Sequence, residues 1–377
     1  MRGTTNRSTS RRLRAALSAA VAVCAVTAVL PAAASAADAA PAPAARGLTT
    51  SVERISIAPD GTTQADGNSG GASITPNGRH VVFSSSARNL SSDTPPAGDN
   101  PYLRDQQTGQ TKRVASLAPL QPPAVSGNGE YVAYATQWMR NVRIRMEQVN
   151  TGRTASANCS AYSCNQPSLS SDGRYLSLAI LYTQPGLERQ RIEVQDSKTG
   201  TTQTVASLPH TLASRPSMSG DARYVAYQDA DRQDVYLRDL PGNTLVGPIE
   251  GPSATASLVQ LSDDGSKIVY LSGTDTYVYD VASATAQPVP NVRGVAIDPT
   301  GRYLLYAPNG TNGTTGPSLT LRDLQTGTDE VVATQPASAG TGAVSAGGHD
   351  VVFQSTADDI VPGDTNGKSD VFVRHFS

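Results

Sequence analysis

The stretch R-P-S-M-S-G-D-A-R-Y-V-A-Y-Q-D-A-D-R-Q-D-V-Y-L-R-D-L-P-G, from Arg215 to Gly242, decides the fold of this chain. It contains two short runs of alternating apolar residues, Tyr224–Tyr227 and Val235–Leu237, and turn-forming residues bound each run. Alternation with a period of two is typical of β-strands that bury one face. The stretch is therefore predicted to form two neighbouring strands of an antiparallel sheet.

The first half of this stretch recurs along the chain. Each copy combines a first strand that mostly contains Ser, a tight turn and a second strand that mostly ends in an aromatic residue. The copies are S-I-T-P-N-G-R-H-V-V-F from Ser73, A-V-S-G-N-G-E-Y-V-A-Y from Ala124, S-L-S-S-D-G-R-Y-L-S-L from Ser168, S-M-S-G-D-A-R-Y-V-A-Y from Ser217, Q-L-S-D-D-G-S-K-I-V-Y from Gln260, A-I-D-P-T-G-R-Y-L-L-Y from Ala296 and A-V-S-A-G-G-H-D-V-V-F from Ala343. The turn positions run from Gly78 to Gly348 and are 45 residues apart on average. Strand-only repeats of ~40 to 45 residues indicate the blades of a β-propeller.

A second pattern follows most copies and completes each repeat. It reads Y-L-R-D-Q-Q-T-G from Tyr102, E-V-Q-D-S-K-T-G from Glu193 and T-L-R-D-L-Q-T-G from Thr320. Asp followed by Gly closes a hairpin, because the carboxylate bonds turn amides and Gly adopts the left-handed conformation. A further short strand comes next, such as Thr202–Ala206. Each repeat thus has four strands, and the chain is predicted to be an all-β, seven-bladed propeller over residues 49–377.

The two ends of the repeat region complement each other. The last copy, D-V-F-V-R-H-F-S from Asp370, stops at Ser377 after its third strand, and an unmatched strand, Ser51–Ala58, precedes the first copy. The N-terminal strand is predicted to pair with the C-terminal blade and close the ring. Closure removes two exposed sheet edges that would otherwise promote aggregation.

The repeats resemble those of TolB-like (WD40-like) β-propellers, exported bacterial proteins whose blades carry a similar S-x-D-G-R-Y-V-A-F and D-V-Y-L-R-D pattern. The resemblance covers residues 50 to 377 and rests on residues that build blades. The resemblance implies the propeller fold. It would also imply the role of true TolB, which is interaction with a peptidoglycan-associated lipoprotein. True TolB has a helical domain before its propeller, whereas the residues before Thr49 in this sequence are expected to form only a signal peptide and a linker.

The N-terminus predicts export. Five arginines precede an apolar run, Ala15–Leu30, and Ala34-Ser35-Ala36 follows, which is the pattern of a signal peptide over residues 1–36. Arg11-Arg12 suggests a twin-arginine signal, which the next residues fit poorly, and Cys24 lacks a lipoprotein cleavage site. Residues 37–48 are predicted to be an Ala/Pro linker. Removing the signal peptide leaves 25 basic and 32 acidic residues, a formal charge of −7.

This charge and composition limit the classes of partner. A mildly acidic chain does not attract nucleic acid or anionic lipid, and no stretch after the signal is apolar enough to span a membrane. The expected state is a secreted or envelope-associated monomer without a membrane span. Expected partners are proteins, peptides or glycans of the cell envelope or medium, and no cofactor is required.

Several motifs contain residue types that can carry chemistry. Cys159 and Cys164, in C-S-A-Y-S-C, indicate a local disulfide in an exported protein. Gly67–Gly71 matches the G-x-S-x-G of hydrolases but is interpreted as a loop, since no helix is predicted after it. The histidines are interpreted as surface strand residues, and they are His80, His210, His349 and His375. No catalytic set is predicted.

Two loop regions carry the remaining site hypotheses. Asp364, Asn366 and Asp370 have a spacing that could bind calcium, with an Asx-type turn as the favoured alternative. Long connections between second and third strands lie at the channel mouth in propellers, where binding residues concentrate. Trp138 and Arg140 in the second such loop and Tyr182 in the third are the predicted binding residues, and packing of Trp138 between blades is the alternative. The stretch from Arg215 to Gly242 has the shortest insertions and is interpreted as scaffold.

The sequence favours a non-enzymatic binding scaffold over an enzyme. A lyase or hydrolase acting on polysaccharide or peptide would need His, carboxylate and Arg or Tyr side chains converging at the channel mouth. A cell-wall structural protein is a third hypothesis, and it would remain with washed walls instead of the culture fluid.

Overall fold

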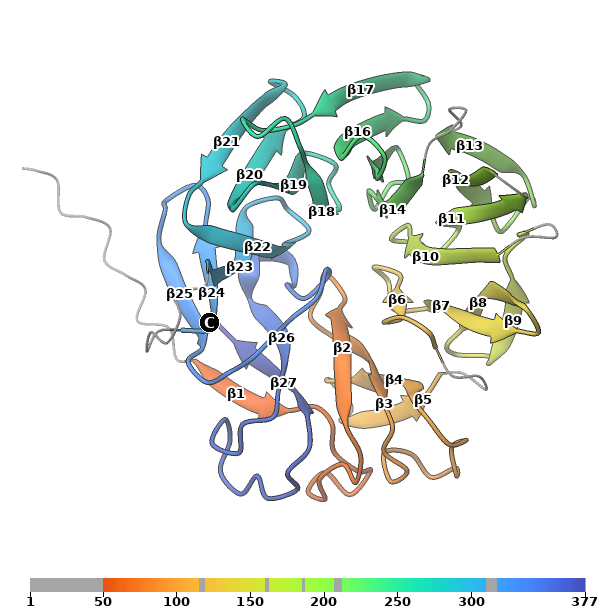
Figure 1. Cartoon of the computed structure of the whole chain (residues 1–377). Helices are drawn as coiled ribbons and strands as arrows, with labels where there is room; N and C mark the ends of the chain where they lie inside the picture. The colour runs from red at the N-terminus through yellow and green to blue at the C-terminus, as the bar shows by residue number, and fades with distance from the viewer. Residues whose placement is uncertain are drawn as a thin grey trace, which may run out of the picture. The chain divides into compact units, whose positions relative to one another are not determined.

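The computed structural model describes residues 50–114, 119–159, 163–184, 187–206, 212–309 and 317–376. The predicted signal peptide and linker lie outside these residues. The described residues belong to one compact unit, and Figure 1 shows its seven antiparallel sheets arranged around a central axis. The predicted all-β, seven-bladed propeller is confirmed. No helix among the described residues is both long and apolar enough to cross a membrane.

The first three blades are continuous in the chain, and each runs from an inner to an outer strand. Blade 1 consists of β2 (Ser69–Ile74), β3 (His80–Ser85), β4 (Asn100–Asp105) and β5 (Gln110–Arg113). Blade 2 consists of β6 (Ala124–Val125), β7 (Tyr131–Trp138), β8 (Asn141–Gln148) and β9 (Arg153–Ser156). Blade 3 consists of β10 (Ser163–Leu169), β11 (Tyr175–Gln184), β12 (Leu187–Asp196) and β13 (Thr202–Ala206).

The next three blades follow the same order. Blade 4 consists of β14 (Ala213–Met218), β15 (Tyr224–Asp229), β16 (Asp234–Asp239) and β17 (Thr244–Ile249). Blade 5 consists of β18 (Ser257–Leu261), β19 (Lys267–Ser272), β20 (Asp275–Asp280) and β21 (Thr285–Val289). Blade 6 consists of β22 (Val292–Ile297), β23 (Tyr303–Pro308), β24 (Leu319–Asp323) and β25 (Asp329–Ala333).

Blade 7 joins the two ends of the chain. Its sheet has the order β1 (Ser51–Arg54), β27 (Asp370–His375), β26 (Asp350–Ser355), and single bridges connect β26 to the inner segment at Ser338 and Val344. A 3-10 turn, η1 (Ala346–Gly348), follows that segment. β1 pairs antiparallel with β27, so the predicted closure is confirmed (Figure 1). The closing strand is shorter than the predicted Ser51–Ala58, because the chain turns away after Ile55 into a bridge between Ile57 and Gln64.

The repeated turn explains why the Ser-x-Asp-Gly pattern recurs. In blade 4, the hydroxyl of Ser219 donates to Asp221 at 2.7 Å and accepts the backbone N–H of Tyr224 at 2.9 Å. Ala222, at the glycine position, has a φ of +58°, which most non-glycine residues avoid. Blade 3 makes the same turn with Ser170, Asp172 and a glycine. Local side-chain hydrogen bonds therefore fix each tight connection between first and second strands.

Charge pairs and stacked rings explain the rest of the pattern. The residue that starts the second strand, or the one before it, pairs with the end of the third strand. These ion pairs are Arg79–Asp105, Arg174–Asp196, Arg223–Asp239, Lys267–Asp280, Arg302–Asp323 and, with the charges exchanged, His375–Asp350. Aromatic residues directly opposite each other stack with centroids 5.4 to 5.9 Å apart, and these are Phe83–Tyr102, Tyr227–Tyr236, Tyr270–Tyr277 and Phe353–Phe372. Such rings bury large apolar areas in the blade cores.

Candidate functional site

The candidate site is the channel along the axis of the ring. A cavity of about 790 Å³ lies there, and the innermost segments of all seven blades line it. This volume is in the range of small-molecule binding pockets. Its wall combines apolar side chains such as Leu258 and Val295 with polar ones such as Gln166 and Ser257. The inner strands thus form a preformed pocket on a rigid scaffold.

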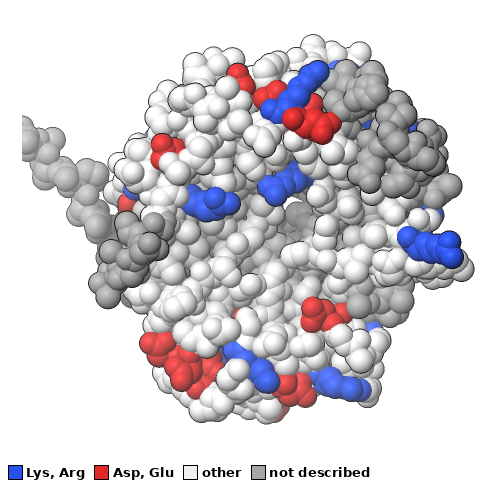
Figure 2. Space-filling view, viewed as in Figure 1, with Lys and Arg blue, Asp and Glu red and all other residues white. Residues whose placement is uncertain are grey.

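Two arginines lie at one end of this cavity, which we call the channel mouth. Arg215 is near the start of β14 and Arg293 is near the start of β22, and both are exposed residues of the cavity wall. β14 and β22 flank β18, the inner strand of blade 5 between them. Figure 2 shows basic side chains beside the central hollow on the face drawn. The channel mouth therefore carries two positive charges, on the two blades that flank blade 5.

Glutamine side chains hold the backbone of the channel mouth in place. The N–H of Gln166 donates to Gln121 Oε1 at 3.3 Å, and the N–H of Arg215 donates to Gln166 Oε1 at 2.7 Å. Arg215 Nη1 then contacts Ser257 Oγ at 3.3 Å and the carbonyl of Leu258 at 3.4 Å. These contacts link blades 2 to 5 around the opening, so the position of Arg215 is fixed before any ligand binds.

The opposite end of the channel is narrowed by the turns between first and second strands. Backbone hydrogen bonds pass from blade to blade there, from Asn128 to Ser171, from Ser171 to Gly220 and from Gly220 to Asp263, at 2.7 to 2.8 Å. A Cβ atom at Gly220 would lie 2.3 Å from Ser171 Oγ and 3.3 Å from the carbonyl oxygen of Asp263, so these turns approach each other closely. The channel is accordingly open at the mouth and constricted at this end.

Asp263 is the acidic residue of the cavity wall, and it lies at the constricted end. Burial, with the nearby carboxylates of Asp264 and Asp298, raises the pKa of Asp263 to about 6. β18 rises about 3.3 Å per residue, so Asp263 lies on the order of 15 Å from the level of Arg215. This exceeds the Debye length of ~8 Å at physiological salt, and Asp263 therefore compensates the arginines only weakly.

Replacing Asp263 by Asn is expected to stabilise the protein near pH 7.5. A carboxylate with a raised pKa binds its proton more tightly in the folded state than in the unfolded state. The ionised Asp263 therefore destabilises the folded state fully above about pH 6, and this destabilisation is absent below about pH 4. The expected gain at pH 7.5 is about 1 to 3 kcal/mol, falling to near zero at pH 4. Denaturant unfolding at both pH values measures it, with exposed Asp231→Asn as the control. A gain that is equal at both pH values would contradict the assigned cause.

Two of the predicted binding residues, Trp138 and Arg140, are not among the described residues that line this cavity. Trp138 ends β7, is 48% exposed and has the guanidinium of Arg145 5.6 Å from its ring centroid. Met139, next to it, is 86% exposed, and Arg140 is also exposed. Tyr182 lies in β11 opposite Arg189, and its side chain is outside the described part of the structure.

The G-x-S-x-G match and the histidines form no catalytic set among the described residues. Ser69 begins β2 instead of lying in the predicted loop, because Gly70 and Gly71 form a bulge that continues the inner strand. Ser69 is buried, and its hydroxyl bonds Ser85 Oγ at 2.8 Å. The three described histidines lie at strand ends or turns, His375 beside Asp350 at 2.7 Å, and His210 is outside the described residues. Cys159 and Cys164 are joined as a disulfide.

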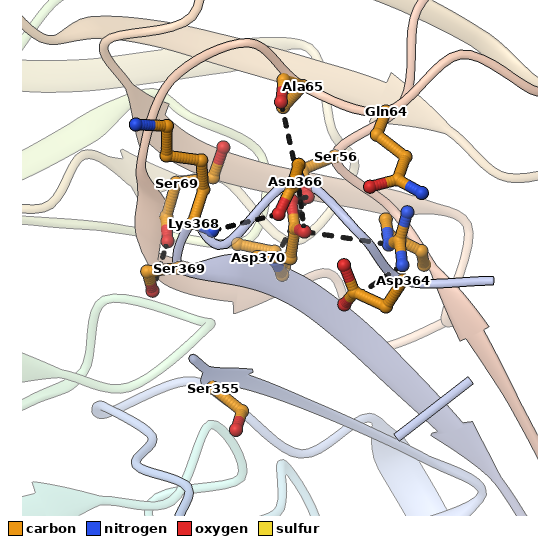
Figure 3. Close-up of polar contacts among 12 residues, drawn as sticks. Ser56, Gln64, Ala65, Ser69, Ser355, Asp364, Asn366, Lys368, Ser369 and Asp370 are labelled. Carbon is orange, nitrogen blue, oxygen red and sulfur yellow. Dashed lines mark hydrogen bonds and ion pairs between the residues drawn. The ribbon is translucent and has the colours of Figure 1, made fainter. Parts of the chain in front are cut away.

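The predicted calcium residues form a buried network with an arginine, shown in Figure 3. Arg54 Nη2 lies 2.9 Å from Asp364, and Arg54 Nε lies 3.6 Å from Asp370. Asp370 also accepts hydrogen bonds from Ser56 Oγ at 2.6 Å and Asn366 Nδ2 at 2.8 Å. The Asn366 side chain accepts the N–H of Lys368, which is the Asx-type turn of the alternative interpretation. A guanidinium from the closing strand thus supplies the positive charge between these carboxylates.

In the part of the chain that the structure describes, no three His, Cys, Asp or Glu side chains are arranged as a metal site. Burial raises the pKa of Asp370, which its polar neighbours partly offset. The three residues Asp364, Asn366 and Asp370 therefore connect the first and last strands of the ring.

Comparisons with known proteins identify the fold. No model of a protein family matches the sequence, and no curated protein matches it. Among solved structures, an oligogalacturonate lyase in complex with manganese matches with a TM-score of 0.63 and 14% identity, over 88% of this chain and 94% of that chain. The oligogalacturonate lyase of Vibrio parahaemolyticus matches with a TM-score of 0.64 and 13% identity, over 87% and 96%. TolB from Acinetobacter baumannii matches with a TM-score of 0.45 and 16% identity, over 70% and 62%.

The two lyase matches span nearly the whole of both chains and show that this chain shares their β-propeller fold. At such identities they show the fold alone. The residues that sequence reasoning missed are Arg215 and Arg293. Arg215 begins the stretch Arg215–Gly242, which is interpreted from the sequence as scaffold, and in the structure this residue lines the channel cavity. The sequence feature that could have identified them is the presence of an arginine near the start of two predicted inner strands.

Proposed function

We propose that this protein is an exported binding module whose ligand lies in the channel mouth. The observation that carries the proposal is the cavity of about 790 Å³, which is preformed by seven inner segments and offers guanidinium, amide and hydroxyl groups at its open end. Pockets with an apolar wall and a few fixed polar groups are the usual ligand sites of proteins. Export is supported by the pattern of residues 1–36.

An enzyme that acts at the same mouth is the second candidate, and the full-length lyase matches favour it. Catalysis on a sugar or peptide needs a positioned acid or base close to the reacting bond. Among the described residues that line the cavity there is no His, Tyr, Glu, Lys or Cys, and Asp263 lies at the constricted end. The composition of the cavity wall therefore supports binding more than catalysis.

A variant that blocks the channel tests the binding proposal. Gly340 lines the cavity, and a Cβ atom there would meet nothing within 4 Å. Gly340→Trp is expected to fill the mouth without disturbing the fold, whereas Gly340→Ala leaves it open. We expect the wild type and Gly340→Ala to bind the same members of a glycan and peptide array, and Gly340→Trp to lose at least about 10-fold in affinity. Equal binding by all three proteins would place the ligand elsewhere and refute the proposal.

A further inference from the structure

We propose that the channel mouth recognises a small ligand that carries two carboxylates, one bound by Arg215 and the other by Arg293. This inference rests on the proposed binding function and specifies the chemical class of the ligand. It starts from the charges of the cavity wall. Of the described residues that line the cavity, Arg215 and Arg293 are the basic ones, and both are on the open side.

Neither arginine has an acidic partner among the described residues. Other arginines of the ring pair with aspartates of their own blade, as Arg223 does with Asp239 at 3.0 Å. The Arg215 side chain contacts only uncharged oxygens, and the Arg293 side chain makes no hydrogen bond or ion pair with the described residues. Two unpaired guanidinium groups in a low-dielectric concavity produce a positive potential that attracts anions. The mouth is therefore electrostatically complementary to a dianion.

Arg215 is oriented for a bidentate contact. Its Nη1 atom makes the contacts with Ser257 and Leu258, which leaves the edge formed by Nε and Nη2 available. That edge presents two parallel N–H groups whose spacing matches the two oxygens of a carboxylate. The backbone of Arg215 also has a φ of +52°, an uncommon conformation for a residue with a side chain, and Gln166 holds it there. The side chain thus projects from a fixed point.

The number of charges favours carboxylates over phosphates. Two guanidinium groups balance two singly charged carboxylates, one to each. Phosphate sites generally add further cations or a cluster of backbone N–H groups. The channel mouth has no lysine among its described residues, and its remaining polar groups, Gln121, Gln166, Ser257 and Thr341, suit hydroxyl or amide groups between the two acids.

Titration calorimetry with defined probes tests this inference. The probes are citrate, a trisaccharide of hexuronic acid and triglutamate, with maltotriose and pyrophosphate for comparison. We expect at least one carboxylate probe to bind more tightly than both comparison compounds, and more weakly at 500 mM than at 50 mM salt. Arg215→Gln and Arg293→Gln are each expected to weaken that binding about 10- to 100-fold. Gln is tolerated at the Arg215 position, because Gln166 has the same conformation in blade 3.

The control is Arg153→Gln, which removes an exposed arginine from the outer strand β9 and is expected to change nothing. Three results would each overturn the inference. They are no binding of any carboxylate probe, tighter binding of pyrophosphate than of the carboxylate probes, and equal binding by the two channel variants and Arg153→Gln. The ligand found on the glycan and peptide array distinguishes failure of the two-carboxylate inference from failure of the proposed channel-binding function. Loss of the ligand in Gly340→Trp but not in the double arginine variant refutes the carboxylate site alone, and retention in both refutes the channel site itself.

Discussion

Deleting residues 49–58 is expected to leave the protein insoluble or to lower its melting temperature by about 10 °C or more. The deletion removes β1, which pairs with β27 over four residues, and exposes the edge of the last blade. It also removes Arg54 and Ser56, two of the three side chains that contact buried Asp370. A buried carboxylate without its partners costs several kcal/mol. Thermal unfolding and the soluble fraction after expression measure the effect.

The matched control deletes residues 37–48, the predicted linker, and is expected to melt like the full mature chain. If the deletion of residues 49–58 also melted at the wild-type temperature, the closure of the ring by β1 would be wrong.

Replacing Arg54 by Met is expected to destabilise the protein by about 3 to 5 kcal/mol. Methionine keeps much of the side-chain volume but leaves Asp364 and Asp370 facing each other in a buried site, where both side chains are at most 4% exposed. Burial and the charge of Asp364 already raise the pKa of Asp370. The loss is therefore expected to shrink at low pH, where protonation of the carboxylates removes their repulsion.

Urea unfolding of Arg54→Met at pH 7 and pH 4 measures both effects. The control is Arg79→Met, which breaks an ion pair between a 43% exposed arginine and Asp105, 16% exposed, and is expected to cost about 1 kcal/mol or less. Equal losses for the two variants, or a loss for Arg54→Met that does not change with pH, would contradict the role given to the network.

The fold could be predicted from the sequence because its determinants are local and repeated. The polar side chains of each turn form hydrogen bonds within five residues, as Ser219 does with Asp221 and with the N–H of Tyr224. The missing fourth strand of the last copy and the unmatched strand near residue 51 predicted the closure. The end of β1 could not be predicted, because the hydrogen bond of Ser56 to Asp370 spans 314 residues.

The site was harder to predict because it depends on the direction of side chains. The bulges that follow Ser214 and Leu258 interrupt the two-residue alternation, so the sequence does not show which residues of an inner strand face the channel. From the sequence, Arg215 belongs to the repeat with the shortest loops, which is interpreted as scaffold, and Trp138 in a longer loop is the predicted binding residue. The calcium hypothesis for Asp364 and Asp370 likewise could not take account of Arg54, which is more than 300 residues away in the chain.

The most direct test of the central claim, that the ligand lies in the channel mouth, is hydrogen–deuterium exchange with and without a ligand identified on the array. The predicted result is slower exchange of backbone N–H groups in the inner segments around residues 166–169, 215–218, 257–261 and 293–297, with the outer strands unchanged. Protection confined to the β7–β8 turn around Trp138, with the inner segments unchanged, would contradict the claim.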